Sequence, residues 1–459
     1  MRTTDSVRMA DGVRCAMLRV KGGIMSADFE KTLADDVARL RAAHRLPSLT
    51  VAVAQHDVVL GAAATGFADA ERQVPVGRDS AYRIGSITKT FTAALALRLV
   101  DRQLLDLNAP VGHYLPATSF GQVPLRMLLA HCGGIQREVP VDMWESMLGP
   151  SEPEFRAALT RVEMVAEPGQ RWQYSNLGYA TLGAIIEHVT GRRCAELITE
   201  TLLTPLGLSQ TSWTPPEEAA VGYRIDPFAD AFHREPVMDM RAIAVLGQLW
   251  STPADLLRWG NALIGGEPEV VPASVVDAMH TLQVMVDTRA WTRGWGLGLI
   301  LDRRDDHVLA GHTGSVPGFQ ASLATDRDSG IVVVACTNAT RGMVLSELTA
   351  ELVDRAATLH PPTIAPVFEP APPCPEEIRD ILGRWWSEGE ETVFTWRHDG
   401  LHAHLADDPD NTDSRFVAEA PDHYRTIEGR YQGERLTVTR SASEIRMHWL
   451  TYPFTRSPR

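Results

Sequence analysis

The stretch YRIGSITKTFTAALALRLV, residues 82–100, places a serine and a lysine three positions apart, Ser86 and Lys89. Lysine is rare in this chain: among 44 lysines and arginines, the lysines are Lys21, Lys31 and Lys89 alone. Arginine keeps its proton in proteins, whereas a desolvated lysine can lose it. A position that needs a general base therefore accepts lysine and excludes arginine, which makes Lys89 a candidate base.

Ser86 and Lys89 would share one face of a predicted helix, because residues three apart are neighbours on a helix surface. Ser86 would also lie at the helix N-terminus, where unpaired N–H groups and the positive end of the dipole favour negative charge. A serine beside a base and oxyanion donors is typical of covalent acyl transfer. The alternative is a capping serine followed by a solvated lysine, and the scarcity of lysine elsewhere argues against it.

Two further stretches carry polar side chains at the ends of predicted elements. In PGQRWQYSNLGYATLG, Tyr174 and Asn176 lie on a loop just before a helix, where Asn176 could simply cap the helix and Tyr174 could simply pack. In AGHTGSVPGFQ, His312, Thr313 and Gly314 end a strand before a Pro-Gly turn. A glycine at that place would let another backbone or a ligand approach closely.

These residues must be positioned by the elements predicted between residues 28 and 358, which are strands near both ends and helices between them. We expect a helix over 28–45, two strands joined at His56-Asp57, and a helix over 86–104. A mostly helical region extends to about residue 290, and a last helix covers 342–358. Strands return at WGLGLILD, HVLAGHTG, GFQASLATD and GIVVVACTN. This order predicts an α+β fold in which helices cover a sheet and a helical lobe is inserted.

A change of character marks the C-terminal part. Residues 361–375, PPTIAPVFEPAPPCP, hold seven prolines and are expected to form a stiff linker. Short alternating runs separated by turn signals follow, which predicts a small all-β domain over 376–459, either a barrel or a curved meander. At the other end, residues 1–27 are expected to be a leader, and Met25 could be the true start.

Composition narrows the class of protein. The formal charge is −14 without a basic cluster, so a nucleic-acid partner is not expected. The five cysteines are scattered without metal-ligand spacing, which favours free thiols in a reducing compartment and no bound metal. No run has the length of a signal peptide core or a membrane span. We therefore expect a cytoplasmic enzyme that acts without a cofactor or a membrane.

The three motifs together resemble the serine β-lactamase and penicillin-binding protein superfamily. They occur in that family's order, as S-x-x-K at 86–89, Y-x-N at 174–176 and H-T-G at 312–314, and the resemblance covers roughly residues 28–358. The Y-x-N form is similar to the class C β-lactamase and D-Ala-D-Ala carboxypeptidase branch. His312 stands where many members have lysine. A histidine at this position is similar to one subgroup of D,D-carboxypeptidases and D-peptide hydrolases. The C-terminal domain resembles the lipocalin-like appendages of some penicillin-binding-protein-type thioesterases.

The resemblance implies an antiparallel sheet and a role for each matching catalytic residue. Ser86 would be the nucleophile and Lys89 the base that takes its proton. Tyr174 would share that proton and pass it to the leaving group as general acid. His131 in LLAHCGG is a tempting second base, but a histidine in an apolar stretch is more often a core residue, and we expect a structural role.

The remaining matches imply binding roles. Asn176 would hydrogen-bond the amide on the acyl side of the substrate, and Thr313 would bond the substrate beside Gly314. His312 would act electrostatically on Tyr174 or bind a substrate carboxylate. The backbone N–H groups of Ser86 and Ser315 would form the oxyanion hole.

The function expected from these roles is a serine acyl-enzyme hydrolase or acyltransferase acting on ester, thioester or amide bonds of peptides. The family's substrates imply a preference for D-configured residues. One alternative is a macrocyclising thioesterase or transacylase of nonribosomal-peptide biosynthesis, whose partner could be a peptidyl thioester on a carrier protein. Others are a D-aminopeptidase, a β-lactamase, an esterase and a non-catalytic penicillin-binding module.

Overall fold

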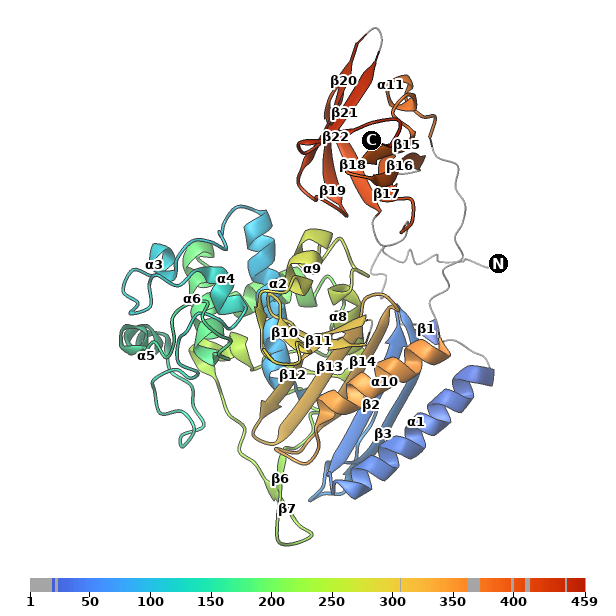
Figure 1. Ribbon diagram of the computed structural model, residues 1–459. Coiled ribbons are helices and arrows are strands. Elements are labelled where there is room, and N and C mark those ends of the chain that lie inside the picture. Colours follow the sequence, from blue (N-terminus) through green and yellow to red (C-terminus); the bar gives the residue numbers. More distant parts are fainter. Residues whose placement is uncertain are drawn as a thin grey trace, which may run out of the picture. The chain divides into compact units, whose positions relative to one another are not determined.

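The chain forms two compact units, Met1–Pro362 and Thr363–Arg459 (Figure 1). The computed structural model describes residues 19–20, 24–305, 307–360, 372–397, 400–408, 413–441 and 444–458. Most of the expected leader, residues 1–27, and most of the expected linker, residues 361–375, lie outside the described residues.

The first unit is built on a ten-stranded sheet with the order β1-β3-β2-β14-β13-β12-β11-β10-β9, to which β4 adds beside β3. The pairs are antiparallel except for the parallel pair β1 and β3. N-terminal and C-terminal strands therefore meet in the middle, where β2 pairs with β14. The bounds are β1 (Arg19–Val20), β2 (Ser48–Gln55), β3 (Val58–Asp69), β4 (Val74–Pro75), β9 (Val284–Met285), β10 (Arg293–Trp295), β11 (Ile300–Arg304), β12 (His307–Val316), β13 (Phe319–Asp326) and β14 (Ile331–Thr337).

The central strands carry apolar side chains on both faces, because helices cover the sheet from both sides (Figure 1). Val51 and Val53 of β2 pack with helices α1 (Ile24–Ala43) and α10 (Leu345–Leu359). Ala52 and Ala54, which point the other way, belong to the core shared with α2 (Thr88–Asp101) and α8 (Pro253–Leu263). This burial on both faces explains the continuous apolar runs of the sequence.

The region between β3 and β9 forms the lobe that carries most of the helices. Its helices and helical turns are η1 (Gly85–Ile87), α2, α3 (Val111–Tyr114), α4 (Leu125–Leu129), α5 (Glu152–Ala158), η2 (Leu159–Arg161), α6 (Asn176–Thr190), α7 (Cys194–Ile198), η3 (Thr199–Leu203), η4 (Arg241–Leu246), α8 and α9 (Ala273–His280). Two small ribbons interrupt it, β5 (Tyr82–Arg83) with β8 (Trp250–Ser251) and β6 (Tyr223–Ile225) with β7 (Phe232–Arg234). The predicted α+β class with an inserted lobe is confirmed.

One predicted strand is wrong in its extent. The run WGLGLILD reads as a single strand, but β10 ends at Trp295 and β11 begins at Ile300. Gly298 between them has φ of 93°, a conformation that favours glycine. The turn lets Trp295 pair with Ile300, so the two halves of the run face each other as a hairpin.

The second unit is an eight-stranded antiparallel meander that follows the short helix α11 (Glu376–Arg379). Its strands are β15 (Gly383–Ser387), β16 (Glu390–Arg397), β17 (Gly400–Leu405), β18 (Ser414–Ala420), β19 (His423–Glu428), β20 (Arg435–Arg440), β21 (Ile445–Trp449) and β22 (Tyr452–Phe454). Paired backbone hydrogen bonds between Trp386 and Thr455 join the first strand to the end of the last. The sheet thus closes into a barrel around an aromatic core, and the predicted all-β domain is confirmed.

Two further observations concern the described residues alone. Cys132, Cys194, Cys336 and Cys374 are free thiols. Among these residues, no helix combines the length and the apolar character needed to cross a bilayer.

Candidate active site

Ser86 lies on η1, a single helical turn that leads directly into the buried helix α2. Gly85, just before it, has φ of 51°, a conformation that favours glycine. A Cβ at Gly85 would come within 2.8 Å of the backbone nitrogen of Ser315. The turn therefore depends on glycine both for its dihedral angle and for the close approach of β12.

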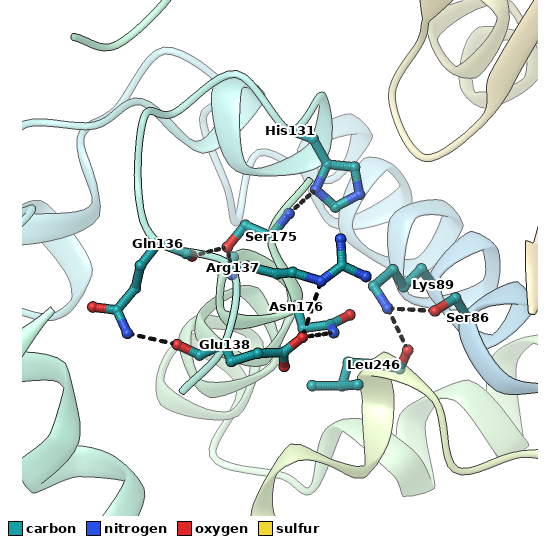
Figure 2. A network of polar contacts seen from close by, with 10 residues as sticks. Ser86, Lys89, His131, Gln136, Arg137, Glu138, Ser175, Asn176 and Leu246 are labelled. Carbon is teal, nitrogen blue, oxygen red and sulfur yellow. Dashed lines mark hydrogen bonds and ion pairs between the residues drawn. The ribbon is translucent and has the colours of Figure 1, made fainter. Parts of the chain in front are cut away.

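Lys89 lies one turn further on, with its side chain completely buried. Its Nζ is 3.0 Å from Ser86 Oγ and 2.7 Å from the carbonyl oxygen of Leu246, at the end of η4 (Figure 2). Burial lowers the pKa of Lys89 to about 7, an effect that the carboxylate of Glu138 opposes and the guanidinium of Arg137 reinforces.

This arrangement makes Lys89 a usable base near neutral pH. A neutral amine has two N–H bonds and one lone pair, and the Leu246 carbonyl can accept one of the N–H groups. The lone pair can then accept the proton of the Ser86 hydroxyl. The serine and its base thus stand within hydrogen-bond reach, as nucleophilic catalysis requires.

Tyr174 comes from the loop before α6, and its ring lies beside Lys89, with Nζ 5.3 Å from the ring centroid. Burial raises the pKa of Tyr174, and hydrogen bonding with the Ser86 side chain opposes that rise in part. A phenol that keeps its proton at neutral pH can donate it, which suits a general acid better than a base.

His131 supports Tyr174 instead of serving as a second base. Its ring packs against that of Tyr174 in a tilted arrangement with centroids 4.1 Å apart, and its Nδ1 accepts a hydrogen bond from the backbone N–H of Ser175. The side chain is buried and its pKa is held well below the usual value, chiefly by desolvation. These contacts fit the structural role that we expected.

Asn176 is the first residue of α6, but it does not cap the helix. Ser175 is the cap, because its Oγ accepts a hydrogen bond from the N–H of Gly178. The Asn176 side chain is thereby free of a capping role, and its Nδ2 donates to Glu138 Oε1 at 2.7 Å (Figure 2). The capping alternative for Asn176 is therefore wrong.

The third motif lies on β12, where this strand extends past its neighbour β11. Residues 307–311 pair with β11, whereas residues 312–316 pair on one side only, with β13. Pro317-Gly318 is a two-residue turn, so Val316 and Phe319 form the hydrogen-bonded pair and the Ser315 N–H points to the opposite edge. The edge of β12 beside Ser86 is thus open to an extended substrate.

Gly314 allows this strand to lie against the serine turn. A Cβ there would be 1.9 Å from the carbonyl oxygen of Ile84 and 3.2 Å from the backbone nitrogen of Ser86. The backbone N–H groups of Ser86 and Ser315 therefore both lie where the turn η1 and the strand β12 come into close contact. Because side chains alternate along a strand, Thr313 and Ser315 are exposed while His312 and Gly314 are buried.

His312 is buried and neutral. Its Nδ1 is 2.6 Å from the Thr313 carbonyl oxygen, so Nδ1 carries the proton and Nε2 is an acceptor. Desolvation and the charge of Lys89 lower the pKa of His312 to about 3. Binding a substrate carboxylate needs an imidazolium or an N–H donor at Nε2, so the carboxylate-binding alternative for His312 does not fit this geometry.

A cleft of about 500 Å³ joins these residues. It is lined by Ser86, Arg137, Glu138, Trp144, Trp172, Tyr174, Asn176, Val286, Arg293, Trp295, Ile300, His312, Thr313 and Ser315. The sequence predicted Ser86, Tyr174, Asn176, His312, Thr313 and Ser315 among these residues. It did not predict Arg137 and Glu138, which follow directly after LLAHCGGIQ and reach the cleft through tertiary contacts.

The positive charges around the cleft are already engaged. Arg293 forms a bidentate pair with Asp302, with N–O distances of 2.6 and 2.8 Å. Arg137 bonds Glu138 and lies over the ring of Tyr174 at 4.8 Å. Within the described part of the chain, no group of three His, Cys, Asp or Glu side chains is placed to hold a metal ion.

Comparison with known proteins decides the family. Residues 33–358 match the family described as Beta-lactamase. The chain is 30% identical over 374 residues to Penicillin-binding protein 4 of Amycolatopsis lactamdurans, which covers 76% of this chain and 96% of that protein. The chain belongs to the β-lactamase and penicillin-binding protein superfamily. Residues 374–456, the barrel, match a domain of unknown function, DUF7586.

Other members of the superfamily add the type of reaction. Esterase EstB of Burkholderia gladioli is 28% identical over 357 residues, which covers 68% of this chain and 90% of the esterase. The structure of a D-stereospecific amidohydrolase from Streptomyces sp. is 26% identical with a TM-score of 0.59, covering 69% of this chain and 97% of that one. With its Ser86–Lys89 pair in place, this member of the superfamily is a serine hydrolase.

Proposed function

We propose that this hydrolase forms an acyl-enzyme from esters or amides of D-configured residues and releases the acyl group to water. The observation that carries the proposal is the hydrogen bond between Ser86 and a buried Lys89 whose pKa is about 7. The similarity to an esterase and to a D-stereospecific amidohydrolase supports the choice of bond and configuration.

The acylation step follows from the positions of the groups. Ser86 Oγ attacks the substrate carbonyl carbon while its proton passes to Lys89 Nζ. The oxygen that becomes negative is stabilised by the N–H groups of Ser86 and Ser315. Tyr174 donates its phenolic proton to the leaving alcohol or amine, and the proton on Lys89 restores the phenol. Water then attacks the ester carbonyl by the same route and frees Ser86.

The charges of the cleft favour neutral leaving groups. Arg137 and Arg293 are ion-paired, and His312 is neutral. A leaving group with a carboxylate, as in a carboxypeptidase substrate, would therefore have to compete with Glu138 and Asp302 for these guanidinium groups. Simple amides, esters and thioesters avoid this cost, because an unpaired charge is expensive to desolvate.

The open edge of β12 supports stereoselectivity. An acyl group that pairs with this edge as a strand presents one face of its Cα to the sheet, so the two configurations place their side chains on opposite sides. We expect the D-configured acyl group to react at least about tenfold faster, which corresponds to roughly 1.4 kcal/mol at the transition state.

Transfer to an amine in place of water is the second candidate, and the open cleft favours it because a second molecule has room beside Ser86. Macrocyclisation of a peptidyl thioester carried by a partner protein is the biosynthetic form of this reaction. It stays a prediction, as does the cytoplasmic location.

The test uses the purified chain with methyl esters, amides and thioesters of D- and L-phenylalanine, with and without an amine acceptor. Products are followed by mass spectrometry, and a fluorophosphonate probe reports acylation of Ser86, with Ser86→Ala as the unreactive control. Preference for the L series would overturn the proposed configuration. Acid as the sole product at every amine concentration would remove the transferase candidate.

A further inference from the structure

The carbonyl group that holds the Lys89 amine belongs to a distant segment of the chain. Leu246, whose carbonyl oxygen accepts from Lys89 Nζ at 2.7 Å, is the last residue of the helical turn η4 (Figure 2). The last carbonyl groups of a helix have no hydrogen-bond partner within it. In η4 these carbonyls accept from side chains of α2 instead. The position of the base therefore depends on how firmly this segment is held.

Two threonines of α2 bond the segment on either side of Leu246. Thr92 Oγ1 donates to the carbonyl oxygen of Val245 at 2.7 Å. Thr88 Oγ1 accepts from the backbone N–H of Leu249 at 3.3 Å. Both threonine side chains are fully buried. Residues three and four apart are neighbours on a helix surface, so Thr92 lies next to the base as well as next to Thr88.

The same segment also contacts the chain that leads to the nucleophile. The backbone N–H of Ile84 donates to the carbonyl oxygen of Leu249 at 2.9 Å, and β8, which follows the segment directly, pairs with β5. Helix α6 packs on the segment so closely that a Cβ at Gly183 would be 2.5 Å from Val245 Cγ2. This segment is thus bonded both to the chain before the nucleophile and to the helix face that carries the base.

We propose that Thr92 is a positioning residue for the hydrolase: its hydroxyl group holds the end of η4, whose last carbonyl keeps Lys89 Nζ within reach of Ser86 Oγ. This inference rests on the proposed function, in which the lysine takes the proton of the serine. Thr92 is fully buried and does not line the cleft, so it acts through the lysine and not on the substrate. A catalytic group misplaced by about 1 Å can lose on the order of 100-fold in rate, so such a residue has a measurable effect.

Thr92→Val removes the hydroxyl group with little change of shape, and it should have two separate effects. The Val245 carbonyl would be left buried without its donor, which is costly, so the end of η4 should shift towards another donor. The ammonium form of Lys89 then loses a hydrogen-bond acceptor, and the loss of such a bond lowers the pKa of an amine. The neutral form loses the bond that orients it, so fewer amines present a lone pair to Ser86.

Other charged and titratable groups also face Lys89, and burial is the largest cause of its lowered pKa. The groups that face it are Tyr174, Tyr179, His131, His312, Arg137 and Glu138. All of them are unchanged in the variants that test Thr92. A difference in the pKa of Lys89 between these variants therefore reports on its bond to the end of η4.

The rate of fluorophosphonate labelling at Ser86, measured over a range of pH, separates the two effects. In the wild type this rate should rise through an apparent pKa of about 7 to a plateau. In Thr92→Val we expect the plateau rate to fall about tenfold, the size of one hydrogen bond, and the midpoint of the rise to fall by about one pH unit. Thr92→Ser keeps the hydroxyl group and should stay close to the wild type in both quantities.

The lysine can also be titrated without any reaction. The lysines of the chain are Lys21, Lys31 and Lys89, so isotopic labelling of lysine gives few Cε signals in an NMR spectrum. The signal that is missing in Lys89→Arg belongs to Lys89, and its change with pH gives the pKa directly. We expect a lower midpoint in Thr92→Val than in the wild type. This titration tests Thr92 even if Ser86 takes up no probe, a result that would contradict the proposed function alone.

Thr90 provides the matched control. Its side chain is as buried as that of Thr92, and its Oγ1 donates to the Ile87 carbonyl at 2.8 Å and accepts from Trp259 Nε1 at 2.7 Å. Thr90→Val therefore removes comparable hydrogen bonds from the same helix without removing a bond to η4. It should lower the melting temperature, as Thr92→Val does, and keep the plateau rate and the midpoint of the wild type.

All variants are compared at a temperature at which circular dichroism shows them folded. A folded Thr92→Val with the plateau rate and the midpoint of the wild type would overturn the positioning role. Equal changes in Thr90→Val would also overturn it, since any buried hydroxyl group of α2 would then have the same effect. If Thr92→Val does not fold, Thr88→Val removes the other bond to the segment: a lower plateau and midpoint are expected there, and an unchanged profile would overturn the inference.

Discussion

Replacement of Lys89 by arginine is the sharpest test of the acylation chemistry, because it keeps the positive charge and removes the usable base. Lys89 is fully buried, and its Nζ reaches both Ser86 Oγ and the Leu246 carbonyl. Arginine carries its proton at any pH at which proteins are folded. The variant therefore has a donor where the mechanism needs an acceptor, and we expect acylation to be lost.

The size of the effect follows from the lowered pKa. An ordinary lysine has a pKa of 10.5, and burial lowers that of Lys89 to about 7. At pH 7 about half of the Lys89 side chains are neutral, against roughly one in three thousand for an unperturbed lysine. Loss of this base should slow acylation by at least about a thousandfold, within the reach of general-base catalysis.

Rates of fluorophosphonate labelling at Ser86, followed by intact-protein mass spectrometry, measure this step alone. In the wild type the rate should rise with pH through an apparent pKa of about 7, because the neutral amine is the active form. Lys31→Arg is the matched control, since Lys31 is exposed on α1 and outside the cleft.

Two results would refute this reasoning. Labelling of Lys89→Arg at the wild-type rate would show that the proton of Ser86 goes elsewhere. A wild-type rate that keeps rising between pH 9 and 11 would show that burial does not lower the pKa of Lys89 as described.

Three further variants test the neighbouring groups. Tyr174→Phe should lower kcat by about 100-fold or more by removing the proton donor, and a change below threefold would contradict that role. Gly314→Ala should lower the melting temperature and the labelling of Ser86, because the new Cβ would lie 1.9 Å from the Ile84 carbonyl oxygen; Gly77→Ala, with no neighbour closer than 3.8 Å, should be tolerated in the same assays. The unfolded chain protonates His312 near pH 6.5, but the folded chain does so only near pH 3. The free energy of unfolding should therefore decrease as the pH is lowered from 6.5 to 3, and urea titrations should show a smaller decrease for His312→Gln.

The fold was predictable where the sequence contains long periodic or apolar runs. The central strands β2 and β14 are buried on both faces, and their runs of valine and alanine indicate this directly. The hairpin of β10 and β11 was not predictable from the pattern, because WGLGLILD has no polar residue before Asp302. Gly298 turns the chain with a positive φ, and the sequence does not show which of the two glycines in this run, if either, makes a turn.

The site was predictable in its motifs and less so in its surroundings. Ser86 and Lys89 share a helix turn, so their spacing alone brings them together. Glu138 reaches the cleft through a tertiary contact with α6, and no local pattern reports that contact. The cap of α6 is a similar case: Ser175 and Asn176 are both good capping residues, and only the backbone geometry selects Ser175.

The nucleophile and the substrate-binding edge belong to one rigid contact. Gly85 and Gly314 let the backbones of η1 and β12 approach so closely that a Cβ on either would collide with the other segment. Because the Ser86 amide and the Ser315 amide lie at this contact, any movement of β12 also changes the distance between the two oxyanion donors. Interiors this tightly packed resist small displacements. We therefore expect the two glycines to fix the position of the attacked carbonyl as well as the shape of the turn.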